Sequence, residues 1–207
     1  MTRDLRICFV GDSLVAGVGD PGGLGWAGRL AARAFADGLP STHYNLGVRR
    51  ETSADIVGRW EDECARRLRH GTDLRVVLCF GVNDATHEGD RPRVAPERSA
   101  ANLAAMLDRA AARGWRVLVV SPPPVADPAH SARTALLDED FARVCRTAGV
   151  PYVSVHRSLS ENAVWMREVA LGDGAHPGAD GYEEYAALLD PHWRAWLAAS
   201  AGGTASG

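Results

Sequence analysis

Five short apolar runs separated by longer amphipathic segments constrain the fold of this sequence more than any other feature. The runs are nearly continuous in apolar character and rich in residues that favour β-strands. Such runs are typical of strands that are buried on both faces, as in a parallel sheet. The five runs are Leu5–Val10, His43–Leu46, Leu74–Phe80, Trp115–Val120 and Pro151–Val155.

Helical patterns fill the segments between these runs. Thr52 and Ser53 stand before an acidic first turn and predict the N-cap of one helix. The alternation of strands and helices along the chain predicts a three-layer α/β/α sandwich with right-handed crossovers. The predicted helices lie at about Trp26–Ala36, Ser53–Arg69, Pro96–Ala112, Ser131–Ala148 and Ala179–Ala198.

Length and composition narrow the possible functions. A chain of 207 residues is typical of a single domain, which we expect to span residues 1–200, with a small, polar and disordered tail at 201–207. The net charge of −3 gives no indication of nucleic-acid binding, and all 23 basic residues are arginine, which excludes a P-loop lysine or a Schiff-base lysine. The N-terminus lacks a secretory apolar stretch and no run approaches membrane-spanning length. We therefore expect a cytoplasmic protein without stable membrane association.

Four polar or glycine-containing motifs fall where a parallel sheet places its functional loops, at the carboxyl ends of the strands and before the last helix. Because these ends lie at one edge of a sheet, we expect the motifs to share a cleft. They are Gly11–Leu14 after the first run, Gly47 after the second, Gly81–Asp84 after the third, and Asp173–His176 before the last helix.

The first of these motifs has two interpretations. Gly17, Gly19 and Gly22 match the G-x-G-x-x-G pattern of a loop that binds a pyrophosphate. Such a loop opens directly into a helix, whereas here the glycine-rich stretch continues and delays the predicted helix to about Trp26. A lone match is weak evidence, but a nucleotide- or phosphate-binding module without catalytic activity stays open as the alternative from a different functional class.

The second interpretation makes Ser13 a nucleophile. A serine hydroxyl needs a general base, which a third group orients, and His176 and Asp173 meet that need from one loop. A developing oxyanion needs hydrogen-bond donors, for which the backbone N–H groups of Ser13 and Gly47 and the side-chain amide of Asn83 are candidates. Taken alone, Ser13 and the Asp173–His176 motif are better explained by a cap or a turn, and Gly47 and Asn83 each have an ordinary turn explanation. Their coincidence at one sheet edge favours acyl transfer.

With these residues in place, the sequence resembles the SGNH hydrolases, also called the GDSL esterase/lipase family. The resemblance runs from Phe9 to Pro177 through four short blocks, which read GDSL, NLGV, GVND and DGAHP. It implies a flavodoxin-like five-stranded parallel sheet and a single catalytic domain without metal or organic cofactor. The residues that it implies are Ser13, Asp173 and His176 as a catalytic triad and Ser13, Gly47 and Asn83 as the oxyanion hole.

The resemblance implies a carboxylic ester hydrolase that works on a small-molecule ester through an acyl-enzyme intermediate. The same residues serve a sugar O-deacetylase or a thioesterase, so these alternatives stay open. Arg49 and Arg50 follow the second block, where many relatives carry small residues. Solvent exposure or pairing with Glu51 is the simpler explanation for them. The sharper hypothesis is that one arginine binds an acidic group on the substrate.

Overall fold

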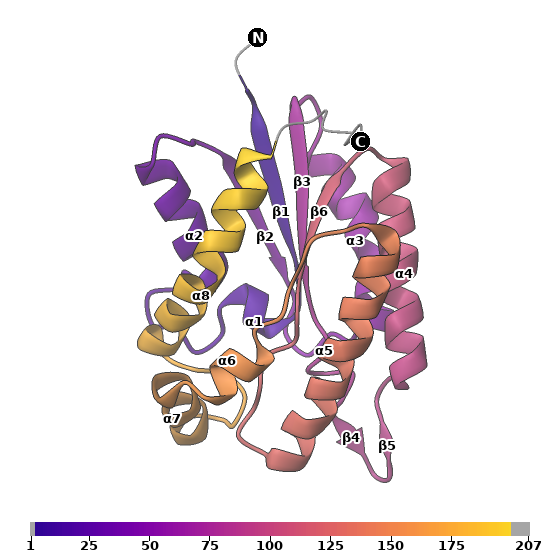
Figure 1. The fold of residues 1–207 in the computed structure, drawn as a ribbon, viewed down its shortest axis with the longest axis vertical. Coiled ribbons are helices and arrows are strands. Elements are labelled where there is room, and N and C mark those ends of the chain that lie inside the picture. The colour runs from indigo at the N-terminus through magenta and orange to yellow at the C-terminus, as the bar shows by residue number, and fades with distance from the viewer. Residues whose placement is uncertain (1–2, 200–207) are drawn as a thin grey trace.

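A computed structural model describes residues 3–199, and its centre is a five-stranded sheet (Figure 1). All neighbouring strands are parallel, in the order β2-β1-β3-β6-β7. Each predicted run overlaps one of these strands, which confirms the predicted fold class. The strands are β1 (Leu5–Gly11), β2 (Thr42–Gly47), β3 (Asp73–Cys79), β6 (Arg116–Val120) and β7 (Tyr152–Val153).

Helices cover both faces of the sheet (Figure 1). Strand β1 shows the division, because Ile7 and Phe9 pack into one apolar cluster while Cys8 and Val10 pack into the other. All four side chains are fully buried, as the apolar run predicts. One face carries α2 (Gly25–Ala36), α6 (His156–Ser160), α7 (Ala163–Leu171) and α8 (Ala179–Ala198), and the other carries α3 (Ser53–Arg67), α4 (Pro96–Ala112) and α5 (Pro128–Ala148).

All five predicted helices are present, and their observed ends lie close to the predicted ones. The Thr52 cap of α3 is confirmed as a capping box with Asp55. Helix α5 begins three residues before its predicted start, because the Asp127 side chain accepts from the N–H of His130 and a proline occupies the first turn. The pattern missed α6, α7, the four-residue helix α1 (Ser13–Ala16) and the antiparallel pair β4 (His87–Glu88) and β5 (Arg91–Pro92), which are short for a periodicity signal.

The register of the sheet brings the carboxyl ends of its strands to one level. Gly11 at the end of β1 pairs with Gly47 on one side and with Cys79 on the other. Cys79 pairs in turn with Val120, and Val120 with Val153. The loops that follow β1, β2 and β3 therefore start side by side, near α1 in Figure 1.

Two further expectations concern particular segments. The tail at 201–207 lies outside the described residues. Within residues 3–199, no helix is long and apolar enough to cross a membrane. All four cysteines are buried and form no disulfide.

A fully buried arginine connects the sheet to the end of helix α8. Arg75 on β3 forms two hydrogen bonds with the carboxylate of Asp73, at 2.8 and 2.9 Å. It also donates to the backbone carbonyls of Trp196, Leu197 and Ala199 and stacks over the Trp196 ring at 4.9 Å. The guanidinium therefore supplies donors to helix-terminal carbonyls that have no partner within the helix.

Replacing Arg75 with methionine should destabilise the protein, because Asp73 then keeps only its more exposed partner Arg3 and the Trp196 carbonyl loses its side-chain donor. We expect a loss of about 2–3 kcal/mol in the free energy of unfolding, measured by urea denaturation. Arg143→Met is the matched control, since Arg143 is 66% exposed, and it should change stability by less than about 0.5 kcal/mol. Equal stability of the two variants would contradict the role given to Arg75.

Candidate active site

Ser13 lies on a tight turn between β1 and α1. The side chain of Asp12 caps α1 by accepting from the N–H of Leu14 at 3.0 Å, so Ser13 becomes the first residue of the helix. Gly11 is required just before the turn, because a Cβ there would collide with the backbone carbonyl of Cys79 and the side chain of Val15. The strand end therefore fixes the position of the Ser13 side chain.

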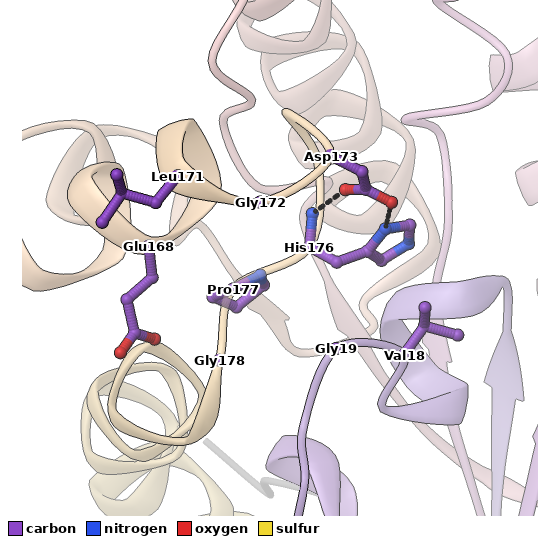
Figure 2. A pocket seen from close by; sticks show the side chains of 9 residues that line it. All are labelled: Val18, Gly19, Glu168, Leu171, Gly172, Asp173, His176, Pro177 and Gly178. Atoms are coloured by element: carbon purple, nitrogen blue, oxygen red, sulfur yellow. Dashed lines mark hydrogen bonds and ion pairs between the residues drawn. The ribbon is translucent and has the colours of Figure 1, made fainter.

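Asp173 and His176 lie on the loop before α8, and the structure brings them to Ser13. The His176 Nε2 atom is 2.7 Å from the Ser13 Oγ atom, although 163 positions separate the residues. On the other side of the ring, His176 Nδ1 is 2.7 Å from Asp173 Oδ2, and Figure 2 shows this contact. Because a carboxylate only accepts, Nδ1 carries the proton, and Nε2 of the neutral ring accepts from the Ser13 hydroxyl.

Backbone contacts hold the loop of Asp173 and His176 in place. Asp173 Oδ1 accepts from the N–H groups of Ala175 and His176, at 3.1 and 3.0 Å. Gly174 has a positive φ of 87° and accepts a 2.8 Å hydrogen bond from the N–H of Ala126, in the proline-rich loop after β6. The loop is therefore a preorganised support for the imidazole.

Asn83 lies in the loop that follows β3 and contacts Asp12, the residue before the nucleophile. Its Nδ2 atom donates to the backbone oxygen of Glu51 at 2.9 Å and makes a longer contact of 3.3 Å with Asp12 Oδ2. The N–H of Ser13 has no acceptor among residues 3–199. The Asn83 amide, whose contact with Asp12 is long, and the free N–H of Ser13 are therefore two candidate donors near the nucleophile.

Gly47 has a different environment from these two donors. Its N–H donates to the side-chain oxygen of Asn45 at 3.0 Å, and the Asn45 amide in turn donates to the carbonyl of Val15 at 2.6 Å. A Cβ at Gly47 would collide with the backbone N of Ala16, so glycine lets β2 pack against α1. Gly47 therefore serves as an oxyanion donor only if this hydrogen bond is exchanged for one to the substrate.

Arg59 on α3 is a contributor that the sequence pattern did not reveal. Its Nη2 atom donates to the carbonyls of Gly11 at 3.2 Å and Leu46 at 3.0 Å, at the ends of β1 and β2. Its Nε atom donates to the Glu51 carboxylate at 2.6 Å. Since the backbone oxygen of Glu51 holds Asn83, a single guanidinium connects the segments that carry all three predicted oxyanion donors.

Arg49 and Arg50 lie on the loop between β2 and α3. Glu51 pairs with Arg59 and with neither of them. Arg49 Nη2 lies 3.9 Å from Asp173 Oδ2, and both side chains are largely exposed. Arg50 has a φ of 69°, a left-handed conformation that is uncommon for a residue with a side chain. The Arg49 side chain therefore lies next to the loop of Asp173 and His176.

The glycine-rich loop is filled by the protein's own carboxylate. Asp20 accepts from the N–H groups of Gly22 at 2.9 Å, Leu24 at 3.2 Å and Gly25 at 2.8 Å, and it pairs with Arg29. The Arg29 hydrogen bond is the main cause that lowers the pKa of Asp20 to about 2, so the carboxylate is charged at neutral pH. The N–H groups that a phosphate would need are thus occupied.

A surface pocket of about 450 Å³ adjoins the histidine. Figure 2 shows it between Glu168 and Leu171 of α7 and the turn of Val18 and Gly19, with His176 in its wall. Leu171 is 81% exposed, which provides an apolar rim. Among residues 3–199, no group of three or more His, Cys, Asp or Glu side chains is arranged to hold a metal ion.

Two carboxylates of the site have shifted pKa values of opposite sign. Burial alone would raise the pKa of Asp173, but the hydrogen bonds from His176 and Ala175 outweigh it and lower this pKa. Burial raises the pKa of Asp12 to about 7, and the nearby Asp84 adds to the effect, while hydrogen bonds from Leu14 and Asn83 oppose it. Asp173, which orients His176, is therefore charged at neutral pH. Asp12, by contrast, changes between its neutral and charged forms near neutral pH.

Comparisons with known proteins show the family and the fold of the chain. The family model for the GDSL-like lipase/acylhydrolase family matches residues 9–184. The chain is 27% identical over 173 residues to Esterase TesA from Pseudomonas aeruginosa, covering 83% of this chain and 79% of that protein. Its fold is similar to a lipase/acylhydrolase from Enterococcus faecalis (TM-score 0.76, 23% identity, 92% and 96% coverage) and to an acetylxylan esterase from Geobacillus stearothermophilus (0.72, 15%, 93% and 95%).

The fold and the site together define a carboxylic ester hydrolase built on a three-layer α/β/α sandwich. The chain belongs to the GDSL-like lipase/acylhydrolase family, as the four sequence blocks predicted. Small-molecule esters are the substrates that this family membership implies.

The raised pKa of Asp12 is testable by carbon-13 NMR of the side-chain carboxyls. We expect the Asp12 signal, assigned with Asp12→Asn, to titrate near pH 7, and the Asp20 signal to titrate near pH 2 in the same sample. Because the folded pKa of Asp12 is raised, its stabilising contribution is complete below about pH 4 and is lost as the pH rises through about 7. The free energy of unfolding of Asp12→Asn minus that of the wild type should therefore increase over this range. An Asp12 titration near pH 4 would contradict the assignment.

Proposed function

We propose that the protein hydrolyses esters through a Ser13–His176–Asp173 triad and a covalent acyl-enzyme intermediate, with residues 1–200 acting as one catalytic domain. The observation that carries the proposal is the 2.7 Å contact between Ser13 Oγ and His176 Nε2. This distance lies within the reach needed for a base to take the hydroxyl proton.

In the first step, Ser13 Oγ attacks the ester carbonyl and His176 Nε2 takes its proton. Asp173 holds the ring in the correct tautomer and stabilises the imidazolium. His176 then protonates the alcohol as the carbon–oxygen bond breaks, which leaves the acyl group on Ser13. In the second step His176 activates a water molecule, which hydrolyses the acyl-enzyme and restores the free serine.

The oxyanion that forms in each step requires donors aimed at its final position. We assign this role first to the N–H of Ser13 and to Asn83 Nδ2, which replaces its 3.3 Å contact with Asp12 by one to substrate. Gly47 joins them if its N–H leaves Asn45. Low charge on Asp12 favours the exchange at Asn83, because a protonated carboxyl is a weaker acceptor.

Sugar O-deacetylation and thioester cleavage use the same steps, so the triad does not choose among them. The fold relative from Geobacillus stearothermophilus is described as an acetylxylan esterase, which makes acetylated sugars a reasonable second class. A substrate panel separates the possibilities: p-nitrophenyl esters of increasing chain length, acetylated xylo-oligosaccharides and acyl-thioesters. The class with the highest kcat/KM defines the activity.

If the protein were instead a non-catalytic phosphate-binding module, it would bind nucleotides and would not react with a fluorophosphonate. A fluorophosphonate reacts covalently only with an activated serine, whereas nucleotide binding releases or absorbs heat in calorimetry. The occupation of the glycine loop by Asp20 argues for the first outcome. Nucleotide binding without fluorophosphonate labelling would reverse the proposal.

Substitutions at the triad and the oxyanion site should give graded effects. We expect Ser13→Ala or His176→Ala to lower kcat on the order of a million-fold, by analogy with a well-studied serine protease. Asn83→Ala should lower kcat about a hundred- to a thousand-fold, the effect of losing one oxyanion donor. Steady-state kinetics with p-nitrophenyl acetate measures all three. Near-normal rates in purified Ser13→Ala protein would rule out the nucleophile.

Arg59 should act as a positioning residue, since its contacts are with the segments that carry the oxyanion donors. We expect Arg59→Met to lower kcat about ten- to a hundred-fold with a smaller change in KM, because displacing the donors weakens transition-state binding. Methylguanidinium should restore part of kcat. Arg66→Met on the same helix is the matched control, because the Arg66 side chain is exposed. An unchanged kcat in folded Arg59→Met protein would refute this role.

A further inference from the structure

The loop that connects β2 to α3 places two consecutive arginines at the mouth of the site. Arg49 and Arg50 directly follow Val48, whose N–H still pairs with the end of β1. The strand end therefore fixes where the loop begins. Both side chains remain exposed to solvent, in a region where the sheet edge and the loop of His176 meet.

The charge of this pair is poorly neutralised. The acidic neighbour in sequence, Glu51, is engaged by Arg59 at 2.6 Å. Arg50 has no acidic partner within 4.0 Å among residues 3–199, and its carbonyl oxygen accepts a 2.9 Å hydrogen bond from Arg93. The structure therefore excludes pairing with Glu51 for Arg49 and Arg50, whereas it confirms that both side chains are exposed to solvent.

Arg49 has one acidic neighbour, the carboxylate of Asp173, at 3.9 Å. That carboxylate already accepts from the N–H groups of Ala175 and His176 and from the His176 ring. At 3.9 Å the guanidinium lies beyond hydrogen-bond distance, and exposed pairs of this kind contribute little stability. Arg49 can therefore move to another anion at small cost while staying next to the catalytic residues.

The backbone of Arg50 supports a functional explanation as well. A residue with a side chain in the left-handed region is held there by its surroundings, and such conformations cluster at functional sites. Here the Arg93 hydrogen bond to the Arg50 carbonyl supplies part of that support. The loop is thus a fixed turn that presents two cationic side chains beside the site.

We propose that Arg49, assisted by Arg50, recognises a negatively charged oxygen group on the substrate, so that the preferred substrates are esters that also carry a carboxylate, phosphate or sulfate. The inference rests on the proposed function of the same site and names its substrate class. A guanidinium suits such groups because its planar set of donors matches two oxygens of the anion at once.

Matched ester pairs test the proposal on both sides of the scissile bond. For the acyl side, the pair is mono-4-nitrophenyl glutarate and its methyl ester. For the alcohol side, the pair is 4-acetoxyphenylacetate and its methyl ester, in which the charge is separated from the leaving oxygen. The readout is the ratio of kcat/KM for the anionic ester to that for the neutral ester, after subtraction of the rate with Ser13→Ala protein. A general loss of activity cancels in this ratio.

We expect the ratio to exceed one for at least one pair in the wild type and to fall about five- to thirty-fold in the Arg49→Gln, Arg50→Gln double variant. Arg49→Lys should retain part of the ratio, and added salt should lower it in the wild type. Arg143→Gln, which removes the same charge from an exposed position on α5, should leave the ratio unchanged.

Equal kcat/KM values for both members of both pairs would overturn the proposal, and so would an unchanged ratio in the double variant. Either result is distinct from failure of the proposed function. That failure would appear as esterase activity that survives Ser13→Ala on the neutral esters.

Discussion

Burial of the sheet on both faces is the constraint on which the rest of the structure depends. Ile7, Cys8, Phe9 and Val10 are consecutive and all fully buried, so β1 has no face on which a polar side chain could remain hydrated. In β1, polar side chains are therefore confined to the strand ends, where the backbone leaves the hydrogen-bonded ladder. The register of the sheet aligns the ends of neighbouring strands. The position of the site therefore follows from the way the sheet is packed.

Much of this arrangement could be predicted from the sequence because each motif interrupts an apolar pattern. Ser13 and Asn83 follow buried strands, and His176 precedes a long helix, so their positions followed from the order of elements alone. Arg59 could not be found in this way. It lies in an amphipathic helix, where an arginine is typical of a solvated face. Its role depends on two carbonyls at the ends of the neighbouring strands β1 and β2, which lie 48 and 13 positions away from Arg59 in the sequence, and no local pattern encodes them.

Gly47 illustrates a second limit of sequence patterns. A motif predicts which residue stands at a strand end, but not the direction in which its N–H points. In β2 the N–H of Val48 donates to Gly11, so the alternation of the strand turns the preceding N–H of Gly47 away from β1 and toward Asn45. Successive N–H groups of a strand point in opposite directions, so the register decides whether a given N–H is available as a donor. A shift of one residue would reverse the direction of each N–H group.

The contacts of the partly or fully buried arginines show why lysine could not replace them. Arg29, Arg59 and Arg75 each contact a carboxylate and at least one backbone carbonyl, and each contact set joins segments far apart in the sequence. A planar guanidinium with five donors can satisfy several acceptors in fixed directions, whereas an ammonium group concentrates its three donors at one point. These three arginines are fully engaged in organising strand and helix ends. Arg49 and Arg50 have the same side chain without such partners. What distinguishes Arg49 from other exposed arginines is its position 3.9 Å from the carboxylate of Asp173, and this position supports the proposed binding of a ligand.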